Sequence, residues 1–309
     1  PKQASPVSKP HLDELAAQGL ERHPLELEAN GFTVVEDALD PDLTARGLEA
    51  ALSAIDERTG RRPDLATGEG YEGYWVWRYT LLKDPAFEEI VMAEKVLALV
   101  DYLIGQDCIL STLTTHIRGR GPSKEMPHGY LPLHGDDPQP HPGYYASTTV
   151  NICLTDVTEE SGCLAFVPGS HKLARQPTPA ERVLAGNDAN SEAVPVVAPA
   201  GAAVVWPSQT WHGSWESPDP GLRVTLAVLY SRPHLQCYEM YRETVPDEAL
   251  ERNSPRFATL MGLDTIGGWN DNQDDWHKQW RDRDRSRYRP RVAGAGPRRV
   301  RGMFEEVDA

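Results

Sequence analysis

The chain has 309 residues, 46 acidic and 31 basic, so its formal net charge at pH 7 is -15. The 39% hydrophobic content is typical of a globular protein, and the negative charge disfavours nucleic acid, whose phosphates would be repelled. We expect no membrane span, because no apolar run approaches the roughly 20 residues required. The four cysteines are widely spaced and lie mostly in apolar runs, so we expect reduced thiols in a cytoplasmic protein.

The first third of the chain contains two sequence patterns that are typical of a helix start. Asp40 precedes Pro41 and Asp84 precedes Pro85, and apolar residues recur at helical spacing after each pair. An aspartate N-cap with proline at the first helical position is a typical helix start. We therefore expect a helix to begin at each site, with Gly105 ending the second helical region. Residues 74–82, between them, are rich in aromatics and predict a strand.

From residue 108 to residue 230 the sequence becomes a series of short β-type runs separated by turn signals. The expected strands are 108–117, 130–133, 146–154, 163–167, 194–198, 202–206, 209–214 and 223–230. Eight strands at this spacing favour a mainly β fold, a two-sheet jelly roll or barrel with the earlier helices on one outer face. The polar stretch 171–193 interrupts the series and is a candidate lid or surface excursion.

We expect one domain in three parts. Residues 1–107 form a helical layer with outer strands, residues 108–237 the catalytic core, and residues 238–309 a C-terminal extension with a helix near 246–260. Within the extension, residues 281–301 contain nine arginines and two aspartates. We interpret this run as pairing with the acidic body or partly disordered, because only Tyr288 offers a ring for stacking on bases.

The chemistry is concentrated in three short motifs. His134 and Asp136 are two residues apart, so on a strand both point to one face, and His212 from a distant strand could complete a three-ligand metal site. Two imidazoles and one carboxylate form the facial triad of non-haem Fe(II) oxygenases. Arg223 follows His212 by 11 residues, where a guanidinium could hold a dicarboxylate bound to the metal, and Thr225 shares its face.

These motifs belong to a longer pattern. The chain resembles the phytanoyl-CoA dioxygenase (PhyH) family of Fe(II)- and 2-oxoglutarate-dependent oxygenases in N-G-F-T-V-V-E-D-A-L-D-P at 30–41, H-G-D at 134–136, E-S-G-C-L-A-F-V-P-G-S-H-K at 160–172, and H-G-S followed by Arg223. The resemblance implies a cupin-like double-stranded β-helix, with His134, Asp136 and His212 as iron ligands and Arg223 as the anchor for the distal carboxylate of 2-oxoglutarate. It implies hydroxylation of a substrate by O2, with release of succinate and CO2. Because Asp136 is present, the halogenating branch of the family is disfavoured.

Other residues near these motifs have weaker signals. Asp137 is an alternative ligand to Asp136, although strand alternation turns it away from His134. On the strand at 108–117, Thr114 or His116 is a candidate contact for the 1-carboxylate of 2-oxoglutarate, and Thr148 or Thr149 is a candidate on a neighbouring strand. A cross-strand structural hydrogen bond is the alternative for each of them.

The sequence says less about the substrate. Arg118 and His128 lie just before the metal motif and would suit an anionic substrate, while Tyr144 and Trp215 could wall an apolar pocket. A solvated basic loop and ordinary aromatic packing are the alternatives. We therefore expect a small organic substrate, anionic or amphiphilic, of acyl or secondary-metabolite type. Two rival functions are a cupin-like metalloenzyme that does not use 2-oxoglutarate and a non-catalytic binding protein on the same fold.

Overall fold

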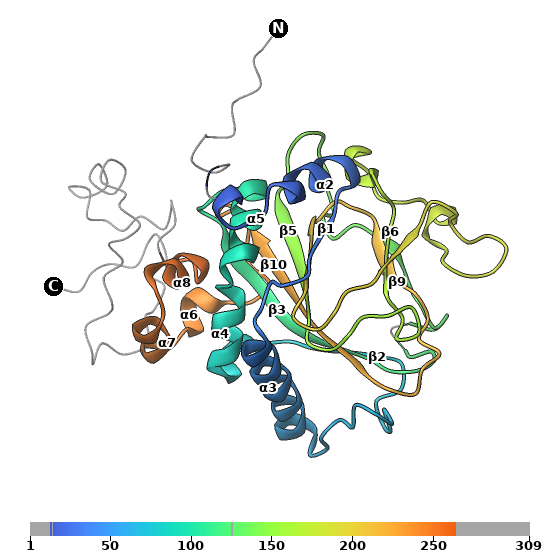
Figure 1. The fold of residues 1–309 in the computed structure, drawn as a ribbon, viewed down its shortest axis with the longest axis horizontal. Helices are drawn as coiled ribbons and strands as arrows, with labels where there is room; N and C mark the ends of the chain where they lie inside the picture. The colour runs from blue at the N-terminus through green and yellow to red at the C-terminus, as the bar shows by residue number, and fades with distance from the viewer. Residues whose placement is uncertain (1–12, 14, 125, 264–309) are drawn as a thin grey trace, which may run out of the picture.

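Two antiparallel sheets face each other at the centre of the fold (Figure 1). The computed structural model describes residues 13, 15–124 and 126–263. The strand order is β1-β8-β5-β10-β3-β2 in the six-stranded major sheet and β4-β9-β6-β7 in the four-stranded minor sheet. Most neighbouring strands are not consecutive in the chain, the exceptions among the described strands being β2–β3 and β6–β7, and this crossing-over between two sheets is the jelly-roll arrangement expected from the strand pattern.

All eight strands expected between residues 108 and 230 are present, each with slightly different ends. The major sheet contains β1 (Thr33–Val35), β2 (Tyr74–Trp77), β3 (Ile109–Arg118), β5 (Ser147–Cys153), β8 (Ala203–Pro207) and β10 (Arg223–Ser231), and the minor sheet contains β4 (Leu131–His134), β6 (Leu164–Phe166), β7 (Val194–Val196) and β9 (His212–Ser214). Strand β1 was not expected. The strand expected at 74–82 ends at Trp77, and the chain continues into a 3-10 turn, η1 (Leu81–Lys83).

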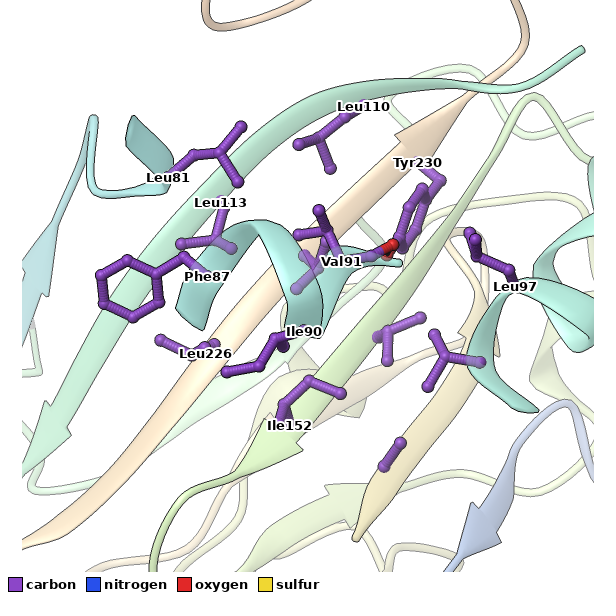
Figure 2. Packing of buried hydrophobic residues seen from close by; sticks show 14 of the residues in the cluster. Leu81, Phe87, Ile90, Val91, Leu97, Leu110, Leu113, Ile152, Leu226 and Tyr230 are labelled. Atoms are coloured by element: carbon purple, nitrogen blue, oxygen red, sulfur yellow. Dashed lines mark hydrogen bonds between the residues drawn. The ribbon is translucent and has the colours of Figure 1, made fainter. Parts of the chain in front are cut away.

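The two faces of the major sheet differ in chemistry. On the outer face, Leu226 and Ile152 pack under Ile90 of the helical layer, as Figure 2 shows. On the inner face, which looks toward the minor sheet, the register pairs Arg223 with Arg118 across β10 and β3. Because successive side chains alternate between faces, one strand supplies both the apolar core and a polar interior.

Helices cover the outer face of the major sheet (Figure 1). They are α2 (Arg22–Asn30), α3 (Pro41–Thr59), α4 (Pro85–Val91) and α5 (Glu94–Ile104), followed after the sheets by α6 (Tyr241–Thr244), α7 (Asp247–Arg252) and α8 (Pro255–Leu260). Both predicted helix starts are confirmed: the side chain of Asp40 accepts from Leu43 N–H at 2.8 Å, and that of Asp84 accepts from Ala86 N–H at 2.8 Å.

Four features of the helical layer differ from expectation. Helix α2 had not been expected, and neither had the short α6. The second helical region divides into α4 and α5 before it ends at Gly105. The helix expected at 246–260 is two short helices, because Pro255 starts α8 and cannot continue α7.

The segment after η2 (Ser170–Lys172) leaves the sheets as expected and contains η3 (Ala180–Arg182) and turns. All four cysteines are free. No helix in the described part of the chain is long and apolar enough to cross a membrane. The arginine-rich run at 281–301 lies outside the described residues.

Candidate metal centre

Two histidines and one aspartate meet between the sheets. His134 ends β4 and His212 begins β9, and the pairing of these strands sets the two residues opposite each other. Asp136 lies two residues beyond β4, with Oδ1 3.7 Å from His134 Nε2 and Oδ2 3.6 Å from His212 Nε2. One ligand atom from each residue lies within 4.8 Å of the others. The structure thus brings together the three residues predicted as metal ligands.

Each imidazole is oriented by the carbonyl two residues before it. His134 Nδ1 lies 2.8 Å from Pro132 O, and His212 Nδ1 lies 2.9 Å from Thr210 O. A ring nitrogen this close to a carbonyl carries the proton, which leaves the Nε2 lone pair free on the side of Asp136. Two imidazole nitrogens and one carboxylate fit Fe(II) and leave coordination positions for other ligands.

Burial and neighbouring charge fix the protonation of this group. Burial, reinforced by His134 and opposed by Asp136, lowers the pKa of His212 to about 4. Burial favours the protonated form of Asp136, but the charges of His212 and His134 and the hydroxyl of Thr149, 2.7 Å from Oδ2, together hold the pKa of Asp136 below its ordinary value of 3.8. At neutral pH His212 and Asp136 are therefore in the deprotonated forms that bind metal.

Asp137 takes no part in this cluster. Its N–H donates to Ser208 O at 3.1 Å, and its Oδ1 accepts from Gln139 N–H at 2.9 Å. The side chain is buried and closes the local turn. Of the two aspartates left open by the sequence, Asp136 is therefore the one near the histidines.

Gln176, in the excursion after η2, clamps the turn between the two ligands. Its Oε1 accepts from Gly135 N–H at 3.0 Å, and its Nε2 donates to Gly135 O at 3.1 Å and to Asp137 O at 2.5 Å. The amide of Gln176 therefore both accepts from and donates to the backbone of Gly135, as the backbone of a neighbouring strand would. The sequence offers no local signal for this residue, because the partners are about forty positions apart.

Arg223 lies on the inner face of β10 and is buried. Its guanidinium donates to Gly162 O and, at 3.4 Å, to Ser214 Oγ, while its Nε has no partner. Ser214 follows His212 by two residues on β9 and so shares its face. This period of two was the signal that would have found Ser214.

Arg118, opposite Arg223, is fully buried. Its guanidinium donates to three carbonyls, those of Gly121 (3.4 Å), Gly129 and Trp215 (3.4 Å), and its Nε also has no partner. These bonds attach the loop before β4 to the interior of the barrel. The expected contact with substrate would have to be made from this buried position and not from a solvated loop.

His116 lies on the same interior face with both ring nitrogens engaged. Nδ1 is 2.5 Å from Tyr74 Oη, and Nε2 is 2.7 Å from Thr114 Oγ1. The Thr114 hydroxyl donates to Ala227 O at 3.4 Å, so Nε2–H is the donor to Thr114 and Nδ1 accepts from Tyr74. Burial, and then the charge of Arg223, lowers the pKa of His116 to about 3, so the ring is neutral.

Two other predicted cosubstrate contacts have different surroundings. Thr225 Oγ1 accepts from Asn151 Nδ2 at 3.3 Å, which leaves its own proton free to be donated. Asn151 Oδ1 is buried without a partner on the same face. Thr149 instead donates to Asp136 and lies 3.1 Å from Ser208 Oγ, so its observed contact is with a candidate ligand.

The remaining predicted substrate residues are not gathered in one place. His128 is exposed and stacks on Tyr130 with centroids 5.9 Å apart. Tyr144 is 38% exposed, and its hydroxyl lies 3.0 Å from His234 Nε2. Trp215 packs against the apolar clusters beneath the minor sheet, with its indole nitrogen buried and unpartnered.

Arg78 is a basic residue that sequence reasoning missed. It directly follows β2, in which Tyr74 points to the interior, whereas Trp77 points out to Arg58 of α3 at 5.2 Å. Strand alternation therefore gives Arg78 the direction of Tyr74. Its charge contributes to lowering the pKa of His116, after burial and Arg223. Arg78 is exposed, and no hydrogen bond or ion pair joins it to another described residue.

Comparison with known proteins places these features in a family. A family model described as phytanoyl-CoA dioxygenase (PhyH) matches residues 27–220. An uncharacterized protein, Rv1501 of Mycobacterium tuberculosis, is 28% identical over 76% of this chain and 84% of its own length. The dioxygenase af480 of Aspergillus fumigatus is 29% identical over 60% of this chain and 57% of its own length.

Solved structures share the fold at lower identity. HygX of Streptomyces hygroscopicus, with nickel and 2-oxoglutarate bound, matches with a TM-score of 0.55 and 18% identity over 71% of this chain and 89% of its own. The epimerase SnoN, in complex with Fe3+, alpha ketoglutarate and nogalamycin RO, matches with a TM-score of 0.53 and 22% identity over 70% of this chain and 85% of its own. At these identities the likeness supports the jelly-roll fold.

Proposed function

The chain belongs to the phytanoyl-CoA dioxygenase family, and from that premise we propose that it is an Fe(II)- and 2-oxoglutarate-dependent dioxygenase that hydroxylates a small organic molecule. The observation that carries the proposal is the cluster of His134, Asp136 and His212, whose ligand atoms lie within 4.8 Å of one another. Bound iron and 2-oxoglutarate supply the oxidising chemistry, in which 2-oxoglutarate is converted to succinate and CO2 as O2 is consumed. The protein supplies the positions of the reactants and a partly dry interior.

Different residues of the chain bind the metal and the 2-oxoglutarate. His134, Asp136 and His212 hold the metal, with Nδ1–H of each histidine fixed by a carbonyl. Arg223 binds the distal carboxylate of 2-oxoglutarate from the other end of the inner face, with Thr225 as a hydroxyl donor beside it. His116 and Thr114 lie on the adjacent strand and bond to each other, so contact with the 1-carboxylate of 2-oxoglutarate would replace the bond between them.

The metal and cosubstrate assignment can be tested without knowing the substrate. Anaerobic addition of Fe(II) and 2-oxoglutarate should produce the visible charge-transfer band of the chelate. His134→Ala should abolish the band, whereas His141→Ala should retain it, because His141 is an exposed histidine outside the cluster. Absence of the band in the native protein, or an undiminished band in His134→Ala, would contradict the proposal.

An anionic group on the substrate is supported by Arg78. A cation that is exposed, directed to the interior side of β2 and free of a protein partner is suited to bind a carboxylate or phosphate. A screen of succinate release should compare carboxylic acids with their methyl esters. Acids should be favoured by the native protein, and Arg78→Met should remove the preference. A native preference for the esters would contradict an anionic substrate.

The chemical outcome needs its own test, because the similar fold of SnoN serves an epimerase. Hydroxylation transfers an oxygen atom from O2 to the product, whereas epimerisation leaves the product's composition unchanged. Turnover under 18O-labelled O2 should therefore give a product heavier by one labelled oxygen. If the product is an unlabelled isomer of the substrate, the reaction is an epimerisation and the proposed hydroxylation is wrong.

Two rival functions fit the structure less well. A cupin-like metalloenzyme without 2-oxoglutarate would not need the buried Arg223, and a binding protein would not need three oriented ligands. The four free cysteines agree with the cytoplasmic location that we propose.

A further inference from the structure

Two buried guanidiniums lie side by side on the inner face without a carboxylate partner. Arg118 is 0% exposed and Arg223 is 4% exposed, and the register of β3 and β10 places them directly opposite each other. Each donates only to neutral oxygens of the described residues. The Nε atom of each is buried and has no hydrogen-bond partner.

A buried charge is costly unless it is compensated, and two adjacent like charges increase the cost. Glu216 acts on Arg118 from a distance, but it is exposed to solvent and forms no ion pair with it. Tyr74, opposite Arg118 on β2, and Ser214, which accepts from Arg223, are neutral and already bonded, to His116 and to Gly162 O respectively. The pair therefore lacks an anionic partner among the described residues.

We propose that Arg118 and Arg223 together form a two-arginine cradle for the distal carboxylate of 2-oxoglutarate, with Arg118 as a second, positioning cation. The inference rests on the proposed function, since it concerns the same cosubstrate. A carboxylate has two oxygens and about four acceptor sites, so it can accept from two guanidiniums at once.

The cradle has a consequence for selectivity. Two cations favour a cosubstrate with a charged distal end over one whose distal end is apolar, because an apolar end would leave both charges uncompensated. Arg118 also holds the carbonyls of Gly121 and Gly129 in the loop before β4. A carboxylate bound by Arg118 would therefore be connected, through this one side chain, to the loop that leads to His134.

The first experiment compares two 2-oxo acids by titrating the charge-transfer band under anaerobic conditions. 2-Oxopentanoate has a methyl group where 2-oxoglutarate has its distal carboxylate, and both can chelate Fe(II) through the 2-oxo acid end. The ratio of their dissociation constants isolates the distal contact. In Arg118→Gln this preference for 2-oxoglutarate should fall about tenfold, the scale of one charge-assisted hydrogen bond, while 2-oxopentanoate should bind as it does to the native protein.

Two further variants separate the cradle from a purely structural bond. Arg118→Lys keeps the charge and should lose less of the preference than Arg118→Gln. Arg256→Lys is the matched control, because Arg256 also donates to a backbone carbonyl, Gln106 O, but pairs with Asp101 away from the inner face. It should leave the preference unchanged. An unchanged preference in Arg118→Gln, or an equal loss for both acids, would overturn the proposal.

A second measurement uses the native protein in case the Arg118 variants fold poorly. With Zn(II) in place of iron, the Nε–H signals of Arg118 and Arg223 are followed by 15N NMR as 2-oxoglutarate is added. Both should shift as new hydrogen bonds form, and a shift of Arg223 alone would overturn the cradle. Absence of the charge-transfer band in the native protein would instead contradict the proposed function, so the two failures are distinguishable.

Discussion

The hydroxyl of Thr149 connects the major sheet to the candidate ligand Asp136, with Oγ1 2.7 Å from Oδ2. Hydrogen bonds of this kind orient a metal ligand and keep its carboxylate ionised. Thr149→Val keeps the shape of the side chain and should weaken Fe(II) binding by roughly tenfold, measured by anaerobic titration. Thr148→Val is the control, because Thr148 is buried on the same strand and donates to Trp206 O at 2.8 Å on the other face. Equal weakening in both variants would mean that Thr149 acts only through stability.

A single isosteric change at Gln176 should disturb the metal site from outside it. In Gln176→Glu, a carboxylate would face the carbonyls of Gly135 and Asp137 instead of an amide donor, and repulsion would push the turn away from the histidines. We expect Fe(II) affinity to fall by about tenfold or more. Gln139→Glu adds the same charge at an exposed position in the same turn and should have little effect. If both variants bind iron equally weakly, the added negative charge, and not the loss of the Gln176 hydrogen bonds to the turn, accounts for the weaker binding.

At the scale of elements, helix α2 depends on a glycine that lies against a buried ring. Gly31 ends α2 at φ +82, and a Cβ there would be 2.2 Å from His171 Nδ1. Gly60 ends α3 at φ +69 with nothing within 4 Å of such a Cβ. Gly60→Ala should therefore cost only the left-handed backbone strain, about 1 kcal/mol, and Gly31→Ala should cost about 2 kcal/mol more through overpacking. Urea unfolding measures both, and equal losses would exclude the steric contribution.

The same elements show why the sequence was informative in some places and silent in others. Helices α3 and α4 could be predicted from Asp40 and Asp84, because a capping side chain followed by proline is a local signal in the sequence. Helix α2 has no such signal: its N-cap residue, Glu21, makes no side-chain capping hydrogen bond, and no proline stands at its first position. Strand β1 has only three residues, too few for a pattern.

The metal cluster was predictable for a related reason. His134 and Asp136 show their spacing within one motif, and Arg223 falls on the strand after His212. The surroundings of Arg118 could not be read in this way, because its partners Gly129 and Trp215 are 11 and 97 positions away. Strand alternation put Arg118 on the interior face, but only packing shows that its charge is buried.

At the scale of the whole molecule, the charge of -15 describes the exterior and not the interior. Arg118 and Arg223 are enclosed between the sheets, while carboxylates such as Glu181 and Glu89 pair with arginines at the surface. An acidic surface around a cationic interior repels polyanions yet favours a small dianion that fits inside. We therefore still expect that the described part of the chain does not bind nucleic acid.

Buried neutral histidines should make the stability of the whole fold depend on pH. Burial, reinforced by the charge of Lys172, lowers the pKa of His171 to about 4 from its ordinary value of 6.5. Between pH 6.5 and 4 the unfolded chain binds a proton that the folded chain does not, so the free energy of unfolding falls as pH falls through this window, by up to about 1.4 kcal/mol per pH unit for one histidine. His171→Leu should reduce the slope of this dependence in urea unfolding from pH 7.5 to 4.5 by the contribution of one histidine, because His116 and His212 still contribute. The exposed variant His141→Gln should leave the slope unchanged. An unchanged slope in His171→Leu would show that His171 accepts its proton without unfolding.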